Sequence, residues 1–161
     1  MTYRILTVCL GNICRSPAAE AVIRAKAAAA GLDVEVDSAG TGAYHIGESP
    51  HSQSVAAGRR RGYPVVGRAR QLDTGDFERF DLILTMDESN LRNVRRLAPP
   101  DATRIEPIMS YGSTGVDEVP DPWGRPDSAY EHMYDLLEDA VDGLIRDLGG
   151  QSEGRRQNDT N

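Results

Sequence analysis

The sequence contains little cysteine and no long apolar run. Cys9 and Cys14 are its only two cysteines, and a pair of thiols in a reducing compartment is more often free than joined as a structural disulfide. No apolar run approaches the ~20 residues that a membrane-spanning helix needs. The first residues lead directly into a strand-like segment, without the apolar core of a signal peptide. We therefore expect a cytoplasmic protein with no membrane partner, although export without a signal peptide stays open.

Excess positive charge and clustered histidines are also missing. The 18 lysines and arginines are outnumbered by 25 aspartates and glutamates, which gives a formal net charge of −7. Proteins that bind nucleic acids or membrane surfaces usually carry a basic face, so we expect neither partner. His45, His51 and His132 are scattered without the spacing of metal ligands. We therefore expect no metal and no cofactor.

Strand-like and helical segments alternate along the chain. Strand patterns occur at residues 4–8, 34–37, 80–86 and 104–108, and helical patterns at 18–30, 52–61, 88–97 and 128–148. The alternation predicts an α/β fold, a three-layer sandwich with a central four-stranded parallel sheet. A length of 161 residues fits one domain. We expect a single domain over residues 1–148 and a polar, disordered C-terminal tail over 149–161.

A cysteine and an arginine flank a short loop near the N-terminus. Cys9 ends the first strand pattern, Arg15 closes the loop, and Ser16-Pro17 is typical of a helix start, with Ser16 as the N-cap. A strand-to-helix loop of this kind directs backbone N–H groups into a concavity that binds anions. Gly11 permits close backbone approach, and Asn12 tolerates a positive φ. The arginine fork can hold two phosphate oxygens while the thiol faces the phosphorus.

The spacing of Cys9 and Arg15 is by itself a weak signal. A free cysteine at the end of a strand is often a small buried apolar side chain and nothing more. The glycine, the asparagine and the Ser-Pro helix start around it favour a functional loop. A helix dipole contributes only about 0.3–1 kcal/mol, too little to stabilise a nucleophilic thiolate. The loop N–H groups, the Arg15 charge and the Ser16 hydroxyl must therefore contribute as well.

Several blocks of the sequence resemble, in the same order, those of the low-molecular-weight protein tyrosine phosphatases. The blocks are residues 9–17 (CLGNICRSP), 37–40 (DSAG), 69–71 (ARQ), 86–91 (MDESNL) and 120–122 (PDP). The similarity extends over residues 4–148, nearly the whole chain. It implies a bacterial member of that family with the flavodoxin-like strand order 2-1-3-4. It also implies hydrolysis of phosphotyrosine monoesters through a phosphocysteine intermediate.

The resemblance implies roles for individual residues. Cys9 would be the nucleophile, Arg15 would hold the developing charge, and Asp121 would act as general acid and then as general base. The phosphate-binding loop would consist of Leu10, Gly11, Asn12, Ile13, Cys14, Arg15 and Ser16. Tyr44, His45 and Trp123 would line the substrate pocket. Cys14 would trap oxidised Cys9 in a reversible disulfide.

The chain departs from the family pattern at two glycines. Gly124 follows Trp123 where many members have a second pocket aromatic, and Gly67 stands where histidine is frequent. Trp123 can still stack on a phenyl ring. The implied partner is a phosphotyrosine-containing protein, with inorganic phosphate as product and competitive ligand. We expect the chain to act as a monomer.

Three alternatives to a tyrosine phosphatase stay open. Arsenate reductases of the same fold need a distant cysteine pair, and this chain has only Cys9 and Cys14. Protein arginine phosphatases carry threonine at the position of Ile13, where a branched aliphatic side chain favours phosphotyrosine. A non-catalytic phosphate-binding module would keep the loop but would have no use for Asp121.

Overall fold

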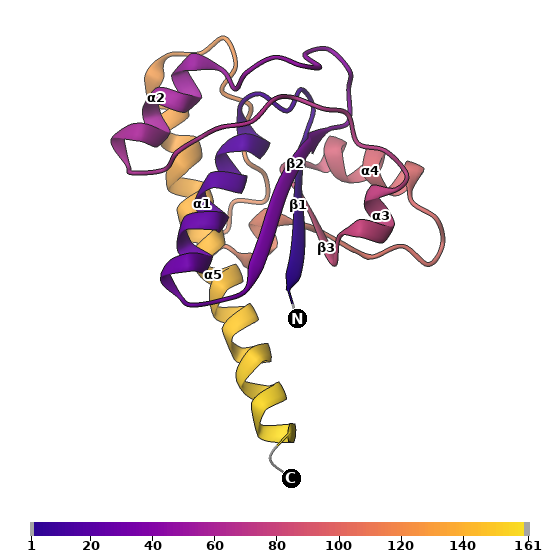
Figure 1. The fold of residues 1–161 in the computed structure, drawn as a ribbon. Helices are drawn as coiled ribbons and strands as arrows, with labels where there is room; N and C mark the ends of the chain where they lie inside the picture. Colours follow the sequence, from indigo (N-terminus) through magenta and orange to yellow (C-terminus); the bar gives the residue numbers. More distant parts are fainter. Residues whose placement is uncertain (1, 160–161) are drawn as a thin grey trace.

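Four parallel strands form the centre of the molecule. The computed structural model describes the backbone of residues 2–159 and the side chains of residues 2–151. The strands are β1 (Tyr3–Cys9), β2 (Val34–Gly40), β3 (Leu82–Thr85) and β4 (Arg104–Pro107), and their order in the sheet is β2-β1-β3-β4 (Figure 1). This order confirms the predicted parallel sheet and its flavodoxin-like arrangement.

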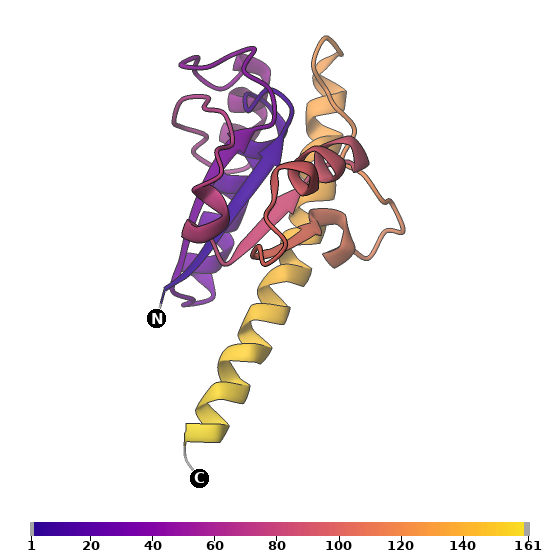
Figure 2. The same cartoon turned by 90° about the vertical axis from the view of Figure 1, so that its right-hand side faces the viewer.

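Helices cover both faces of the sheet. One face carries α1 (Arg15–Ala29), α2 (Ser52–Arg60) and α5 (Asp127–Asp159), and the other carries α3 (Asp76–Arg79) and α4 (Glu88–Leu97) (Figures 1 and 2). Successive side chains of a strand point to opposite faces. In β1, Ile5 and Cys9 accordingly pack in the core beneath α1 and α5, while Leu6 and Val8 pack in the smaller core beneath α4. The three-layer sandwich is therefore confirmed.

The first helix begins earlier than its sequence pattern predicts. Helix α1 starts at Arg15, and Cys14 occupies the N-cap position without a side-chain hydrogen bond. Ser16 is therefore not the N-cap; its side chain is fully buried behind the loop. Pro17 falls in the first turn, where its missing N–H leaves no helical bond unmade.

Two further elements differ from their sequence patterns. Strand β2 continues to Gly40, through residues whose composition predicts a loop. Helix α3 is a single turn, too short to show helical periodicity, and the sequence analysis missed it. Gly40 at the end of β2 pairs with Cys9, and Asp76 of α3 pairs with Arg70, whose backbone N–H donates to Asn12 in the loop between β1 and α1.

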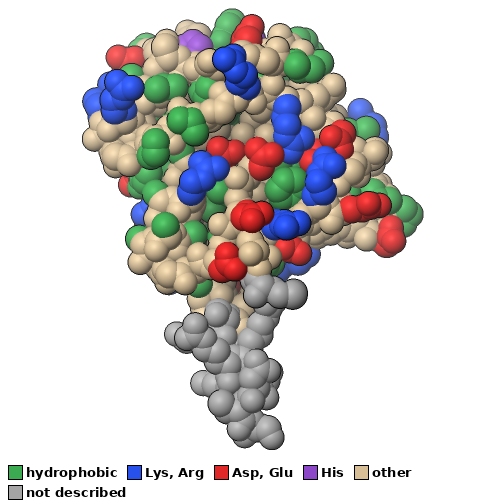
Figure 3. Space-filling model, viewed as in Figure 1, with side chains coloured by type: hydrophobic (Ala, Val, Ile, Leu, Met, Phe, Trp, Pro, Cys, Tyr) green, Lys and Arg blue, Asp and Glu red, His purple; other side chains and the backbone are tan. Residues whose placement is uncertain are grey.

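The C-terminal helix is the longest element, and its backbone continues to Asp159. The backbone of residues 149–159, which belong to the predicted disordered tail, continues this helix, whereas the side chains of residues 152–161 lie outside the described residues. The domain boundary at residue 148 stays a prediction. Across residues 2–159, none of the helices combines the length and apolar character that crossing a bilayer requires. The face of the molecule in Figure 3 carries acidic and basic side chains interspersed, without a basic patch.

Candidate active site

The loop between β1 and α1 lies at the carboxyl end of the sheet, where open parallel α/β sheets bind their ligands. Asn12 adopts φ 57°, and it is the one residue other than glycine with positive φ among the described residues. A Cβ built on Gly11 would lie 3.0 Å from Cδ2 of His45. The predicted uses of Asn12 for the turn and of Gly11 for close approach are therefore both seen.

The Cys9 thiol lies at the floor of this loop with two polar neighbours. Its Sγ atom is 3.0 Å from the Ser16 hydroxyl oxygen, and the Asn12 N–H donates to it at 3.3 Å. The cysteine is only 3% exposed, yet it lines an open cavity of about 370 Å³. Both neighbours can donate a hydrogen bond to a sulfur that carries negative charge.

The Asn12 side chain orients the Ser16 hydroxyl. Its Nδ2 atom donates to Ser16 Oγ at 2.8 Å and to Ser38 Oγ at 2.9 Å. Since Ser16 Oγ accepts this bond, its own hydrogen is free to point at Cys9 Sγ, 3.0 Å away. The competing acceptor, the Ala39 carbonyl oxygen, lies farther off at 3.4 Å. The network therefore directs a hydroxyl donor at the sulfur.

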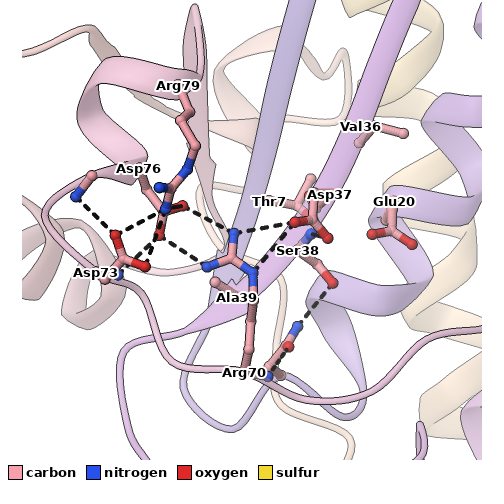
Figure 4. A network of polar contacts seen from close by, with 12 residues as sticks. Thr7, Glu20, Val36, Asp37, Ser38, Ala39, Arg70, Asp73, Asp76 and Arg79 are labelled. Atoms are coloured by element: carbon pink, nitrogen blue, oxygen red, sulfur yellow. Dashed lines mark hydrogen bonds and ion pairs between the residues drawn. The ribbon is translucent and has the colours of Figure 1, made fainter.

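Arg70 holds the other end of the Asn12 amide. Its backbone N–H donates to Asn12 Oδ1 at 3.0 Å, and its guanidinium bridges Asp76 at 3.0 Å and Asp37 at 3.2 Å (Figure 4). Burial would raise the pKa of Asp76, but hydrogen bonds from Arg70, the Asp73 amide and Arg79 outweigh it and hold that pKa below its usual value. Arg70 and Asp76 are supporting residues to which the sequence analysis assigned no role.

Glu20 is a second buried carboxyl behind the loop. Figure 4 shows it on α1, with its side chain toward Asp37 on β2. Burial raises the pKa of Glu20 to about 7, against the charge of Arg24 3.4 Å away. A small cavity of about 40 Å³ adjoins it and reaches Asn12 and Gly67. Gly67 adopts φ +101°, a backbone conformation that favours glycine, and a built Cβ there would have no heavy atom within 4 Å.

Arg15 is buried and held by acidic partners. Its Nη1 atom donates to Asp87 Oδ2 at 2.6 Å and to the Val119 carbonyl at 3.0 Å, while Nη2 lies 3.9 Å from Asp121 Oδ2. Burial would lower the pKa of Arg15, but Cys9 and Asp87 outweigh it and raise that pKa. Asp87 also caps α4 by accepting a bond from the Asn90 N–H at 2.7 Å. Asp87 belongs to the block at residues 86–91, and the sequence analysis assigned no role to it.

Asp121 reaches the same cavity from the loop before α5. Its side chain is 50% exposed, and its Oδ1 accepts a hydrogen bond from the Trp123 N–H at 3.1 Å. Trp123 and Tyr44 are 59% and 75% exposed and stand at the cavity mouth. Tyr44, His45 and Trp123, the residues predicted to form the substrate pocket, all line this cavity. The full lining is Cys9, Leu10, Gly11, Ile13, Cys14, Arg15, Tyr44, His45, Asp121 and Trp123.

Cys14 lines the cavity in a less polar environment. Its sulfur lies 3.9 Å from the Tyr130 hydroxyl oxygen. Burial raises the pKa of the Cys14 thiol to about 12. The described residues contain no group of three or more histidine, cysteine, aspartate or glutamate side chains placed to hold a metal ion. The cavity therefore offers a sulfur, a guanidinium, a carboxylate and backbone donors for its chemistry.

The chain is similar to known proteins over most of its length. The family model of low molecular weight phosphotyrosine protein phosphatase matches residues 4–154. A low molecular weight protein-tyrosine-phosphatase of Streptomyces coelicolor is 43% identical over 162 residues, which cover 96% of this chain and 99% of the relative. The low molecular weight phosphotyrosine protein phosphatase of Homo sapiens is 41% identical over 138 residues, which cover 83% of this chain and 87% of the relative. A crystal structure of protein tyrosine phosphatase from Entamoeba histolytica has a TM-score of 0.90 at 36% identity, covering 93% of this chain and 99% of that one.

Proposed function

The chain belongs to the low-molecular-weight phosphotyrosine protein phosphatase family, and on that premise we propose that Cys9, Arg15 and Asp121 carry the hydrolysis of phosphotyrosine monoesters. The observation that supports this assignment is a single cavity that all three side chains line. The sulfur has two potential donors, the guanidinium is buried, and the carboxylate is open to solvent. Hydrogen-bond donors suit a nucleophilic sulfur, and a buried guanidinium suits stabilisation of charge in the transition state. Access to solvent suits a carboxylate that acts as general acid and base.

In the first step the Cys9 sulfur attacks phosphorus in line with the departing phenol oxygen. The S–P bond forms as the P–O bond to the tyrosine ring breaks, and protonated Asp121 gives its proton to the phenolate. Arg15 and the N–H groups of the loop hold the three remaining oxygens, on which charge accumulates. Arg15 is already aligned by Asp87 and the Val119 carbonyl, so little reorganisation is required.

In the second step water replaces the sulfur on phosphorus. Asp121, now a carboxylate, accepts a proton from the attacking water, and the S–P bond breaks as inorganic phosphate forms. Cys9 leaves as a thiolate, which the Ser16 hydroxyl and the Asn12 N–H stabilise by hydrogen bonding. The phosphate product fits the same loop and therefore competes with substrate. Neither step needs a cofactor or a metal.

The cavity above the loop favours a flat aromatic leaving group. Trp123 and Tyr44 form its mouth, and Leu10 and Ile13 supply apolar lining. Such walls stack on a phenyl ring, and a phosphoserine side chain is too short to use them. The branched aliphatic Ile13 leaves no hydroxyl for a phosphoguanidinium, which favours phosphotyrosine over phosphoarginine. We propose a phosphotyrosine-containing protein as the substrate and the cytoplasm as the compartment.

The two cysteines of the loop supply a redox control for this activity. Cys9 and Cys14 both line the cavity, so an oxidant that reaches one also reaches the other. A disulfide between them would remove the nucleophile and protect Cys9 from irreversible oxidation. We propose that this pair switches the phosphatase off reversibly.

One set of assays tests the proposed function. Purified protein is given a chromogenic aryl phosphate and then peptides that carry phosphotyrosine, phosphoserine or phosphoarginine. We expect turnover of the aryl phosphate and the phosphotyrosine peptide, competitive inhibition by inorganic phosphate, and a radiolabelled phosphocysteine after acid quenching. A preference for phosphoarginine would overturn the substrate assignment. Arsenate-dependent thiol oxidation without ester hydrolysis would support a reductase, and binding without turnover would support a non-catalytic module.

A further inference from the structure

Cys14 lies next to a pair of side chains that the hydrolysis does not use. The Tyr130 hydroxyl oxygen is 3.9 Å from Cys14 Sγ and 3.3 Å from His51 Nδ1. The rings of Tyr130 and His51 stack, with centroids 5.7 Å apart and planes 8° from parallel. Tyr130 is fully buried, whereas His51 at the start of α2 is partly exposed. The three groups therefore form a line from the cavity toward solvent.

The hydrogen bonds of His51 give this line a direction. The Gln53 N–H donates to His51 Nδ1 at 3.4 Å, so in this geometry Nδ1 is the unprotonated ring nitrogen. The Tyr130 hydroxyl then donates to Nδ1, and its oxygen is left to accept from the Cys14 thiol. Each proton in the line points toward His51, which is the arrangement that a proton relay needs.

We propose that Tyr130 and His51 form an acid–base site that removes the proton of Cys14 when Cys14 condenses with oxidised Cys9. The proposal deepens the redox control described above and rests on Cys9 being the reactive thiol. Thiolates, not thiols, attack sulfur. Cys14 is deeply buried, so without a base nearby it stays a thiol and reacts slowly.

The reaction balances with a hydroperoxide as the oxidant. Cys9 thiolate attacks the peroxide, the O–O bond breaks, and Cys9 sulfenic acid forms as hydroxide or alkoxide leaves. Cys14 sulfur then attacks Cys9 sulfur, the S–S bond forms, and the S–O bond breaks with loss of hydroxide. The Cys14 proton passes to Tyr130 as the Tyr130 proton passes to His51. His51 releases a proton to solvent, hydroxide takes one up as water, and the two sulfurs have given two electrons to the peroxide.

The charged and titratable groups around Cys14 favour such a relay over direct ionisation. The pKa of Cys14 is raised to about 12, chiefly by burial, with Cys9 and Asp121 acting in the same direction and the Tyr130 hydroxyl and the Arg15 charge acting against it. Burial also raises the pKa of Tyr130, and Cys14, Asp121 and Asp127 add to the rise. The Tyr130 hydroxyl therefore passes a proton on without becoming an anion itself.

The test follows the oxidation of the full-length reduced protein by hydrogen peroxide. Mass spectrometry with dimedone trapping and thiol alkylation separates Cys9 sulfenic acid from the Cys9–Cys14 disulfide over time. Tyr130→Phe keeps the ring but removes the relaying hydroxyl. We expect disulfide closure to slow by roughly 100-fold, the lower end of what a positioned acid–base group contributes, with trapped sulfenic acid accumulating.

Two further variants make the test specific. Tyr134→Phe removes another buried hydroxyl, which donates to the Ser54 carbonyl at 2.8 Å and has no bond to Cys14. Its closure rate should match that of the unmodified protein. His51→Asn keeps an acceptor at the helix cap but not the base, and it should slow closure as Tyr130→Phe does. Aryl phosphate turnover should persist in all three variants.

The outcomes separate this proposal from the proposed function. Unchanged closure in both Tyr130→Phe and His51→Asn would overturn the relay while leaving the phosphatase intact. Equal slowing in Tyr134→Phe would also overturn it, because loss of any buried hydroxyl would then suffice. Failure of peroxide to inactivate the unmodified protein or to oxidise Cys9 would instead contradict the assignment of Cys9 as the reactive thiol.

Discussion

The two cysteines at the ends of the segment from Cys9 to Cys14 occupy opposite environments although only four residues lie between them. Cys9 faces polar donors, the Ser16 hydroxyl at 3.0 Å and the Asn12 N–H at 3.3 Å. Cys14 faces the packed core, where burial raises its pKa to about 12 and its one polar side-chain contact is Tyr130 at 3.9 Å. The same functional group therefore meets hydrogen-bond donors in one place and a buried, less polar environment in the other.

This contrast shows that chemical role depends on what lies behind the loop. The donors around Cys9 are themselves held: Asn12 fixes Ser16, Arg70 fixes Asn12, and buried Asp76 fixes Arg70. At Cys14 the sulfur instead meets the Tyr130 hydroxyl, which in turn contacts His51. Donors that are already in position stabilise charge in the transition state without having to move, and apolar side chains cannot provide this stabilisation.

Replacing each cysteine in turn has the largest expected effect. Cys9→Ser should lower aryl phosphate turnover by roughly 10⁴- to 10⁶-fold, as loss of a covalent nucleophile does elsewhere. Cys14→Ser should retain measurable turnover and lose the peroxide-induced disulfide. Steady-state assays with and without peroxide give both results. A comparable loss of turnover in the two variants would contradict the proposed difference in role between Cys9 and Cys14.

Removing the Asp121 carboxylate comes next. Asp121→Asn should slow turnover of esters with poor leaving groups by about 10²- to 10⁴-fold, because the phenolate then departs without a proton. Activated esters such as aryl phosphates with electron-withdrawing groups should lose much less. A series of leaving groups of graded acidity measures this difference. An equal loss across the series would exclude Asp121 as the general acid.

Removing the Ser16 hydroxyl tests the polar side of the contrast. A hydrogen bond to a charged group contributes about 1.5–3 kcal/mol, so Ser16→Ala should lower turnover by about 10- to 100-fold. The loss should fall on the steps in which Cys9 carries charge, and burst kinetics with a chromogenic ester separates those steps. The matched control is Ser38→Ala, which removes only the second acceptor of the Asn12 amide. An equal loss in both variants would contradict the direct role of Ser16.

The ion pairs behind the loop should matter more for stability than for turnover. Asp76→Asn leaves the Arg70 and Arg79 guanidinium groups without their buried partner, and the free energy of unfolding should fall by on the order of 3 kcal/mol. Turnover should fall less than in Ser16→Ala. Asp73→Asn removes an exposed partner of Arg79 and should change stability by less than about 1 kcal/mol. Urea unfolding of both variants makes the comparison.

Glu20 is another buried titratable group, and its replacement should have the smallest effect on turnover. Its pKa is raised to about 7 by burial, so the folded state holds its proton more tightly than the unfolded state does. Stability therefore falls as the pH rises from about 4.5 to about 7, and the loss is complete above that range. Glu20→Gln should flatten this fall. Thermal unfolding at pH 5 and pH 8 measures the difference, and an unchanged pH dependence would contradict it.

The fold was largely predictable because its signals are local. Alternating strand and helix patterns indicate a parallel sheet, and the loop motif at Cys9 places the site at its carboxyl edge. Helix α1 begins at Arg15 because the Ser16 hydroxyl is used inside the loop and not as a cap. The Asn12 amide holds the Ser16 hydroxyl in that position and also contacts Ser38. The residues next to Ser16 in the sequence do not reveal these contacts.

The supporting residues of the site were harder to predict because they act through contacts far apart in the sequence. Arg70 and Asp76 meet Asn12 only after folding, and Asp87 approaches Arg15 from the start of α4. Tyr130 has the helical spacing of a core residue, and it is one; its hydroxyl contacts with Cys14 and His51 follow from tertiary packing. The sequence predicts the reacting groups, and the three-dimensional structure shows which residues contact and hold them.

The relative reactivity of the two thiols tests the central claim most directly. Reduced protein is treated with iodoacetate near neutral pH, and peptide mass spectrometry follows alkylation at Cys9 and at Cys14 together with loss of aryl phosphate turnover. The account predicts that Cys9 is modified first, that activity falls in step with it, and that inorganic phosphate protects it. Faster alkylation of Cys14, or full activity after complete alkylation of Cys9, would contradict it.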